Sequence, residues 1–309
     1  MAIKKIKTSS HDEWLALRHQ YIGGSDCAAI VGMNKFSSPY ALWAEKIDLI
    51  EPFKGNLATD VGTFLEPFIA QRWAETTGKK VRNDNLSFVN DQYPWAIANI
   101  DRKVEGENAG LECKSCSELR MKEFKNGEYP ENYYAQCVHY LAVTGYQKWY
   151  LAVLVGNRQF LTFEIERDED EIKALMAEES KFWYTYVVPK KAPPKDGSEA
   201  TTNTINEIYS SDDGSTVDLT GLEHLLEQRK TLTSLKKDTE KAIAEIDNQI
   251  KDFMRSATKA ICGLFTISWK VQKTAGIDRD AFRRDHPGID LSDYATESRV
   301  FRITERKSS

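Results

Sequence analysis

The sequence predicts a mixed α+β (or α/β) fold, and three observations support this prediction. The first quarter of the chain has apolar residues at helical spacing, the central part has short apolar runs typical of strands, and helical patterns return between and after those runs. The resulting order is helices, two strands, helix, two strands and helix. Hydrophobic residues make up 41% and charged residues 29% of the 309 positions, a balance that permits a packed core and excludes general disorder.

Start and stop signals predict the helices of the first quarter. Ser10 begins one helix as a capping residue, Ser25 can cap a short second helix, and Ser38 followed by proline opens a third. A stripe of apolar residues between 61 and 73 predicts a longer helix that ends at Gly78. Pro67 forces either a start or a kink within that helix.

The central part changes to short runs separated by turn residues. The segment EGENAG suits a hairpin between the first two runs, and Gly156 with the following asparagine suits a second hairpin. The predicted order is strand 96–105, strand 110–117, helix 130–145, strand 148–156, strand 158–166 and a helix from about 168 to 187.

Composition divides the chain into three parts. Residues 1–188 form the predicted core domain, residues 189–204 read as a linker rich in Pro, Lys, Ser and Thr, and residues 205–309 form a C-terminal extension. Within the extension, a broken heptad stripe over 220–255 predicts a long helix that needs a partner. That partner is either another subunit or the following elements, which we expect to be strand 264–272, helix 278–286 and strand 298–304.

Charge and segment content limit the class of protein. A net charge of −5 provides no general attraction to nucleic acid, so DNA binding would need a local basic surface. No apolar run is long enough for a membrane span and the start lacks the apolar stretch of a signal peptide, so we expect a cytoplasmic protein without membrane contact. Five cysteines without a tight framework indicate reduced thiols.

One group of charged residues points to chemistry. Glu112 and Lys114 alternate with apolar neighbours, so a strand would direct both to one face. If the preceding strand pairs with this one, Asp101 comes beside Glu112, and two carboxylates with a backbone carbonyl form an oxygen site for Mg²⁺ or Mn²⁺. The alternative is a solvated Glu–Lys pair on an exposed strand. Cys113 and Cys116 would face opposite ways, which argues against zinc or an iron–sulfur cluster.

The spacing of Asp101, Glu112 and Lys114 resembles the PD-(D/E)xK nuclease core, although Ile100 stands where that pattern has proline. The surrounding segments are more specific: WLALRHQYIGGSDCAAIVG, SPYALWAEK, GTFLEPFIAQRWAETTG, NIDR, LECKS and YYAQCVHYLAVTG occur in this order. Together they resemble the YqaJ-like viral recombinase family, which is related to bacteriophage lambda exonuclease, over roughly residues 11–187. The resemblance implies a central mixed sheet flanked by helices.

The resemblance also implies roles for individual residues. Asp101 and Glu112 match the metal-binding acids, the carbonyl of Cys113 completes the site, and Lys114 matches the catalytic lysine. Glu66 matches an additional acid near the metals, and Gln136 matches a glutamine of the site.

Each of the less central residues has an ordinary alternative. Glu66 can be a first-turn acid that interacts with the helix dipole. Tyr140 lies one turn after Gln136 and is expected to serve mainly in packing, while His139 adjoins the predicted site without metal-ligand spacing. Arg18 and Ser25 match residues that hold a 5′ phosphate in the lambda-type enzymes; otherwise Arg18 pairs with an acid on its helix and Ser25 only caps.

The function implied is a Mg²⁺-dependent exodeoxyribonuclease, with Mn²⁺ as a substitute, that degrades the 5′-ended strand at double-stranded DNA ends. It would leave 3′ single-stranded tails for recombination, in a bacterial cell that carries a phage or prophage. The relatives imply a single-strand annealing protein as partner and a homo-oligomer such as a ring-shaped trimer. Two alternatives remain: a non-catalytic DNA-end-binding scaffold, and a restriction-type endonuclease of the same superfamily.

Overall fold

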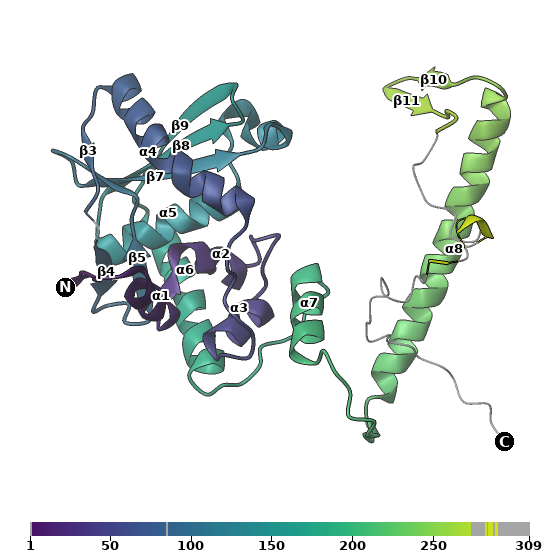
Figure 1. Cartoon of the computed structure of the whole chain (residues 1–309), viewed down its shortest axis with the longest axis horizontal. Helices are drawn as coiled ribbons and strands as arrows, with labels where there is room; N and C mark the ends of the chain where they lie inside the picture. Colours follow the sequence, from purple (N-terminus) through teal and green to yellow (C-terminus); the bar gives the residue numbers. More distant parts are fainter. Residues whose placement is uncertain (1, 85, 273–281, 283, 287, 290–309) are drawn as a thin grey trace. The chain divides into compact units, whose positions relative to one another are not determined.

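The structure is a computed structural model that describes residues 2–84, 86–272, 282, 284–286 and 288–289. The chain divides into two compact units, Met1–Ser210 and Ser211–Ser309 (Figure 1). The first unit combines helices with two sheets, and the second contains a long helix and a two-stranded hairpin. The first unit has the mixed α+β architecture that the sequence predicts, and it carries every predicted site residue.

Local signals mark several helix ends in the first quarter of the chain. The Ser38 hydroxyl accepts the Ala41 N–H and proline occupies the next position, while Gly78 ends the longest helix of this unit at a φ of 72°. Pro67 lies inside that helix and is not its start. The observed helices are α1 (His11–His19), α2 (Gly24–Ile30), α3 (Pro39–Lys46) and α4 (Leu57–Thr77).

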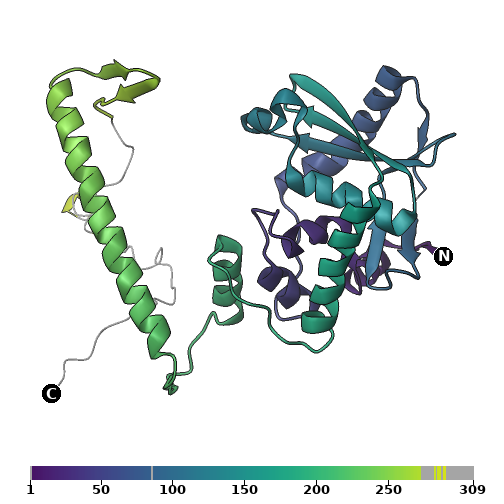
Figure 2. The same ribbon diagram turned by 180° about the vertical axis from the view of Figure 1, so that it is seen from behind.

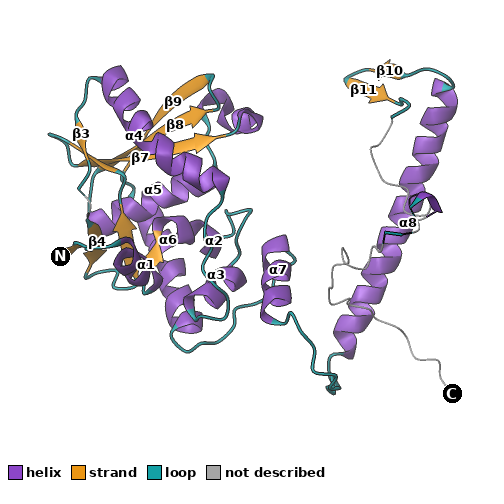
Figure 3. Cartoon of the chain, viewed as in Figure 1, coloured by secondary structure: helices purple, strands orange, loops and turns teal. Residues whose placement is uncertain are grey.

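Two sheets form the centre of the first unit (Figure 3). The larger sheet is mixed, with the order β3-β6-β7-β8-β9; β7 and β8 are parallel and its other neighbouring strands are antiparallel. Its strands are β3 (Val81–Arg82), β6 (Arg102–Val104), β7 (Ala109–Cys116), β8 (Lys148–Val155) and β9 (Gln159–Glu166). The smaller sheet, of order β1-β4-β5-β2, contains β1 (Ile3–Ile6), β4 (Ser87–Asn90), β5 (Ala96–Asn99) and β2 (Ile22–Gly23).

The run predicted as one strand over 96–105 is divided between these sheets. β5 belongs to the smaller sheet and β6 to the larger one, so the chain passes from one to the other at Ile100 and Asp101. The predicted hairpin itself is confirmed, because β6 pairs antiparallel with β7 and places Arg102 opposite Leu111. Asp101 therefore lies at a crossover between sheets, which is a position set by tertiary structure.

Helices cover both faces of the larger sheet (Figures 1 and 2). On one face, α4 packs through Ile69 and Trp73 against Leu111 and Cys113 of β7. On the other face lies α5 (Glu131–Thr144), which is buried along almost its whole length and connects β7 to β8. The two faces of β7 thus carry different residues, with Cys113 toward α4 and Glu112 toward α5.

The segment after the second hairpin is more ordered than its composition suggests. The helix predicted over 168–187 is confirmed as α6 (Glu169–Phe182) followed by a π-helical turn, Trp183–Val187. The region expected to be a linker, 189–204, contains the start of α7 (Glu199–Ile208). Thr201 and Ser38 share a buried hydroxyl–hydroxyl hydrogen bond of 2.7 Å, which fixes α7 on α3, and the first unit consequently extends to Ser210.

The second unit contains the expected long helix, α8 (Glu223–Met254). Most of its large apolar residues are solvent exposed, whereas Met254 at its end is buried. The hairpin that follows consists of β10 (Lys259–Cys262) and β11 (Phe265–Ser268). Most of the helix expected over 278–286 and the strand expected over 298–304 lie outside the described residues. Among the helices that the structure describes, none combines the length and the apolar character needed to cross a bilayer.

Candidate metal centre and phosphate-binding cluster

Strand β7 directs Glu112 and Lys114 to the face covered by α5. The Lys114 ammonium lies 2.5 Å from the Glu112 carboxylate at Oε1. The Gln136 amide donates to the same oxygen at 2.7 Å. Glu112 is only 2% exposed, so the alternative of a solvated Glu–Lys pair does not fit the structure.

The crossover between the sheets places Asp101 beside β7. Its Oδ2 atom accepts the backbone N–H of Cys113 at 2.8 Å, so the carboxylate is fixed to the residue that follows Glu112. The Cys113 thiol is packed in the core under α4, whereas Cys116 contacts the core cluster on the other face. All five cysteines are free thiols.

The surroundings of the two carboxylates disfavour their ionised forms. Burial raises the pKa of Asp101, and the negative charge of Glu112 raises it further. Burial also raises the pKa of Glu112, with Glu66 adding to the shift against the opposing charge of Lys114. The Oε2 atom of Glu112 is buried and has no hydrogen-bond partner within the described protein. A divalent cation is the group that such an unpaired oxygen donor set suits best.

Lys114 remains a cation in this environment. Burial would lower its pKa, but the negative charges of Glu112 and Asp101 raise it above the usual value. Its ammonium also lies 5.6 Å from the ring centre of Tyr133 on α5. A lysine held in this way donates hydrogen bonds and does not act as a free base.

Glu66 reaches the group from α4 on the other side of the sheet. Its Oε1 atom lies 2.5 Å from Nη1 of Arg102, which also donates to the backbone carbonyl of Asp101 at 2.6 Å. The negative charge of Glu66 contributes to the raised pKa of both Asp101 and Glu112, so all three acids lie within electrostatic range of one another. Sequence reasoning missed Arg102, although its place directly after Asp101 in an alternating strand predicts that it faces α4.

Gln136 connects the acids to the N-terminal helices. Its amide nitrogen donates to the Tyr140 hydroxyl at 2.9 Å as well as to Glu112. Tyr140 packs so closely on α2 that a Cβ at Gly24 would lie 2.5 Å from its ring. Burial and the charge of Glu112 raise the pKa of Tyr140, and the charge of Arg18 opposes this shift. It therefore lies between the acids and a second cluster.

The second cluster contains the predicted phosphate-binding pair. Nη2 of Arg18, in the last turn of α1, donates to the Ser25 hydroxyl at 2.5 Å. The sequence allows Ser25 as a possible cap of α2, but Gly23 holds that position. Sequence reasoning also missed two buried partners: Asp26 lies 3.6 Å from Arg18 and 2.9 Å from Lys46. Lys46 lies far from Arg18 and Asp26 along the chain, so no local pattern predicts that the three meet.

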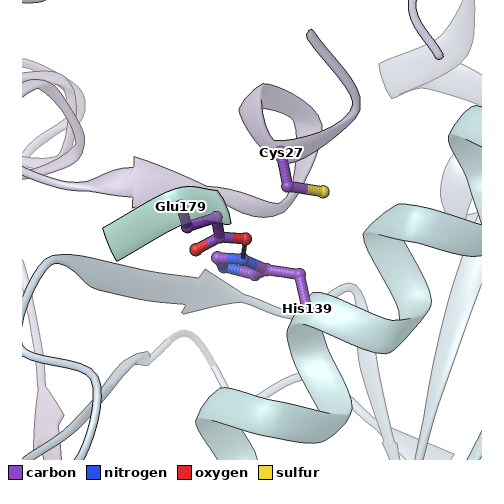
Figure 4. A group of neighbouring side chains, drawn as sticks. All are labelled: Cys27, His139 and Glu179. Carbon is purple, nitrogen blue, oxygen red and sulfur yellow. Dashed lines mark hydrogen bonds and ion pairs between the residues drawn. The ribbon is translucent and has the colours of Figure 1, made fainter. Parts of the chain in front are cut away.

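His139 belongs to a buried cluster with Cys27 and Glu179 (Figure 4). Its Nδ1 atom lies 2.8 Å from Glu179 Oε1, and its Nε2 atom lies 3.0 Å from the carbonyl of Ile97. Burial alone would lower the pKa of His139, but the charge of Glu179 raises it. Both ring nitrogens are paired with oxygens, so this cluster connects α5, α6 and β5 as a structural element.

Sequence comparisons extend over nearly the whole chain. The profile of the YqaJ-like viral recombinase domain matches residues 13–147. The uncharacterized protein YqaJ of Bacillus subtilis (strain 168) is 33% identical over 292 residues, which cover 93% of this chain and 92% of that protein. The similarity thus includes both compact units.

Solved structures resemble more than half of the chain. The alkaline exonuclease LHK-Exo from Laribacter hongkongensis aligns with a TM-score of 0.50 and 25% identity, covering 58% of this chain and 94% of that chain. LHK-Exo in complex with dAMP aligns with the same TM-score at 23% identity and the same coverage, which supports the shared fold.

Proposed function

Because this chain belongs to the YqaJ-like viral recombinase family, we propose that it is a metal-dependent exodeoxyribonuclease acting on double-stranded DNA ends. It degrades the 5′-ended strand and leaves a 3′ single-stranded tail. The observation that carries the proposal is the buried, unpaired Oε2 of Glu112 beside Asp101 and Lys114. The likeness of the fold to an alkaline exonuclease supports the same reaction class.

Asp101, Glu112 and the carbonyl of Cys113 would hold Mg²⁺, for which Mn²⁺ can substitute, with Glu66 as an additional acid. The cation supplies Lewis-acid activation of water and stabilises charge on the scissile phosphate. Gln136 keeps the Glu112 carboxylate in a fixed orientation through its 2.7 Å hydrogen bond. Lys114, held as an ammonium by its acidic neighbours, orients the attacking water and donates to the phosphate.

Arg18 and Ser25 would bind the 5′-terminal phosphate of the strand that is degraded. Arg18 is about one-third exposed and Ser25 is exposed, so both groups are accessible to a strand end. Phosphate is the same at every DNA step, so cleavage should depend little on sequence and should weaken with added salt. Arg18 would thus provide local positive charge for DNA binding, although the net charge of the chain is −5.

The remaining assignments concern the domains, the partner, the oligomeric state and the setting. The nuclease domain, expected over 1–188, corresponds to the first compact unit, which extends to Ser210, and the unit that follows it serves assembly, DNA clamping or partner binding. The exposed apolar residues on α8 support assembly or partner binding, because both would cover them. A single-strand annealing protein is the proposed partner, a homo-oligomer such as a trimer is the proposed form, and the cytoplasm of a bacterium that carries a phage or prophage is the proposed setting.

The test is digestion of a linear duplex carrying either a 5′ phosphate or a 5′ hydroxyl, in Mg²⁺ or in EDTA. We expect mononucleotides from the 5′ end in Mg²⁺ only, with a preference for the phosphate. A closed circular duplex separates the alternatives: a restriction-type endonuclease cuts it, whereas an end-dependent enzyme leaves it intact. Binding to DNA ends without cleavage in any metal would instead support the scaffold.

A further inference from the structure

We propose that the buried ion pair of Asp26 and Lys46 positions Arg18 and Ser25 for the 5′-terminal phosphate, and that it thereby sets the preference for phosphorylated over hydroxyl ends. The inference rests on the proposed function, since it concerns the phosphate that begins the degraded strand. It assigns to Asp26 and Lys46 the role of positioning residues, which support the groups that touch DNA.

Three helices meet at this ion pair. Asp26 comes from α2, Lys46 is the last residue of α3, and Arg18 lies in the last turn of α1. The Lys46 ammonium lies 2.9 Å from Oδ2 of Asp26 and donates to the backbone carbonyl of Arg18 at 3.3 Å. Its side chain is 2% exposed. Lys46 therefore fixes the end of α1, from which the Arg18 side chain extends.

The two oxygens of Asp26 have separate partners. Oδ2 accepts the Gly23 N–H at 3.0 Å and pairs with Lys46. Oδ1 faces Arg18 Nη2 at 3.6 Å and lies 3.4 Å from the Ser25 hydroxyl. One carboxylate thus holds the first turn of α2 with one oxygen and directs the guanidinium and the hydroxyl with the other.

The Arg18 guanidinium is restrained on a second side. It lies 5.5 Å from the ring centre of Trp14, one turn earlier on α1, in a cation–π arrangement. A guanidinium held in one orientation loses less conformational entropy when it binds a phosphate with paired hydrogen bonds. The buried side of the cluster is thus fixed, while Arg18 and Ser25 remain accessible.

The charge of the cluster suits an anion. Arg18 and Lys46 carry two positive charges against one negative charge on Asp26. Burial and the charge of Asp26 raise the pKa of Glu45, the half-buried neighbour of Lys46. A buried ion pair is seldom more stable than an apolar pair of the same size, so stability alone does not account for Asp26 and Lys46.

A purely structural role for Asp26 makes a different prediction. If Asp26 only caps α2, then an asparagine, whose side-chain oxygen still accepts the Gly23 N–H, should leave DNA-end preference unchanged. If the carboxylate charge directs Arg18, the same change should abolish the preference. Asp26→Asn therefore separates the two roles.

The experiment measures kcat/KM on linear duplexes with a 5′ phosphate and with a 5′ hydroxyl, and takes the ratio for each full-length protein. We expect the wild type to prefer the phosphate by roughly 10- to 100-fold, the effect of one or two hydrogen bonds to a charged group. Asp26→Asn should lower the ratio to about twofold or less on the same scale. The control Asp48→Asn, an exposed carboxylate at φ 62°, should keep the wild-type ratio.

A second variant guards against misfolding, because Asp26→Asn leaves Lys46 buried without its carboxylate partner. The double change Asp26→Asn with Lys46→Met removes both charges and should also lose the preference. An unchanged ratio in either folded variant would overturn the inference while leaving the exonuclease assignment intact. A wild type that cleaves without preferring the phosphate would instead remove the proposed phosphate site itself.

Discussion

Asp26 and Asp101 are both withdrawn from solvent, yet their environments shift their pKa values in opposite directions. At Asp26, burial raises the pKa, but the charges of Lys46 and Arg18 outweigh burial and lower it to about 2. At Asp101, burial and then the charge of Glu112 raise the pKa, and Lys114 does not compensate. The first cluster contains its own cations. In the second, Lys114 does not offset burial and the two negative charges, which fits the metal centre that we propose.

The largest expected effect concerns the acid with the unpaired oxygen. Glu112→Gln removes the charge but keeps an acceptor for Gln136, so the fold should persist while cation binding is lost. We expect Mg²⁺ binding by calorimetry to disappear and exonuclease activity to fall by about 10³-fold, the scale of losing a central electrostatic group. Retention of wild-type Mg²⁺ affinity would show that the cation site lies elsewhere.

The next effect concerns Asp26 and the free energy of unfolding at acidic pH. Its folded pKa of about 2 lies below the ordinary aspartate value of 3.8, so its stabilisation is present above pH 4 and is lost as the pH falls toward 2. The amount is about 2 kcal/mol. Between pH 7 and pH 3, the free energy of unfolding measured in urea should fall less for Asp26→Asn than for the wild type. Equal losses in the two proteins would contradict the ion-pair assignment.

The close approach that joins the two clusters gives a smaller effect. Gly24→Ala places a Cβ 2.5 Å from the Tyr140 ring, so we expect a loss of about 1–3 kcal/mol in the free energy of unfolding. The matched control is Gly62→Ala on α4, where a Cβ meets only the Ser115 hydroxyl at 3.7 Å. That control should be neutral or gain about 0.5–1 kcal/mol. Similar stabilities for the two variants would argue against tight packing at Gly24.

The smallest effect sharpens the contrast at Asp101. A carboxyl whose folded pKa is raised destabilises the metal-free protein once the pH exceeds its unfolded pKa, so stability falls as the pH rises. Asp101→Asn should therefore raise Tm in EDTA at neutral pH, while Mg²⁺ should raise the Tm of the wild type more than that of the variant. A lower Tm for the variant in EDTA would contradict the raised pKa.

The features of the fold and the site that the sequence predicts depend on local interactions. Ser38 with its proline and Gly78 mark helix ends through interactions within a few residues, and strand alternation places Glu112 and Lys114 on one face. Gln136 follows from the resemblance, and its position on α5 facing Glu112 is observed. The helix ends and the strand alternation need no knowledge of the tertiary fold, whereas the contact between Gln136 and Glu112 does.

Features that depend on distant partners were not predictable. The run that contains Asp101 divides between two sheets because β5 and β6 have different neighbours, which no local pattern shows. Asp26 and Lys46 meet only after α2 and α3 pack together. The start of α7 lies in a segment with a linker's composition and is fixed by the Thr201–Ser38 hydrogen bond. In each case, a contact far along the sequence decides the structure.

Cleavage of an end-labelled linear duplex by Lys114→Ala tests the central claim most directly. The matched control is Lys173→Ala, an exposed lysine on α6, and both variants should match the wild type in circular dichroism. With Mg²⁺ present, we expect Lys114→Ala to release mononucleotides at least about 10²-fold more slowly than the wild type, the scale of a positioned catalytic group, and Lys173→Ala to be unchanged. Wild-type cleavage by Lys114→Ala would contradict the assignment of Asp101, Glu112 and Lys114 as the catalytic centre.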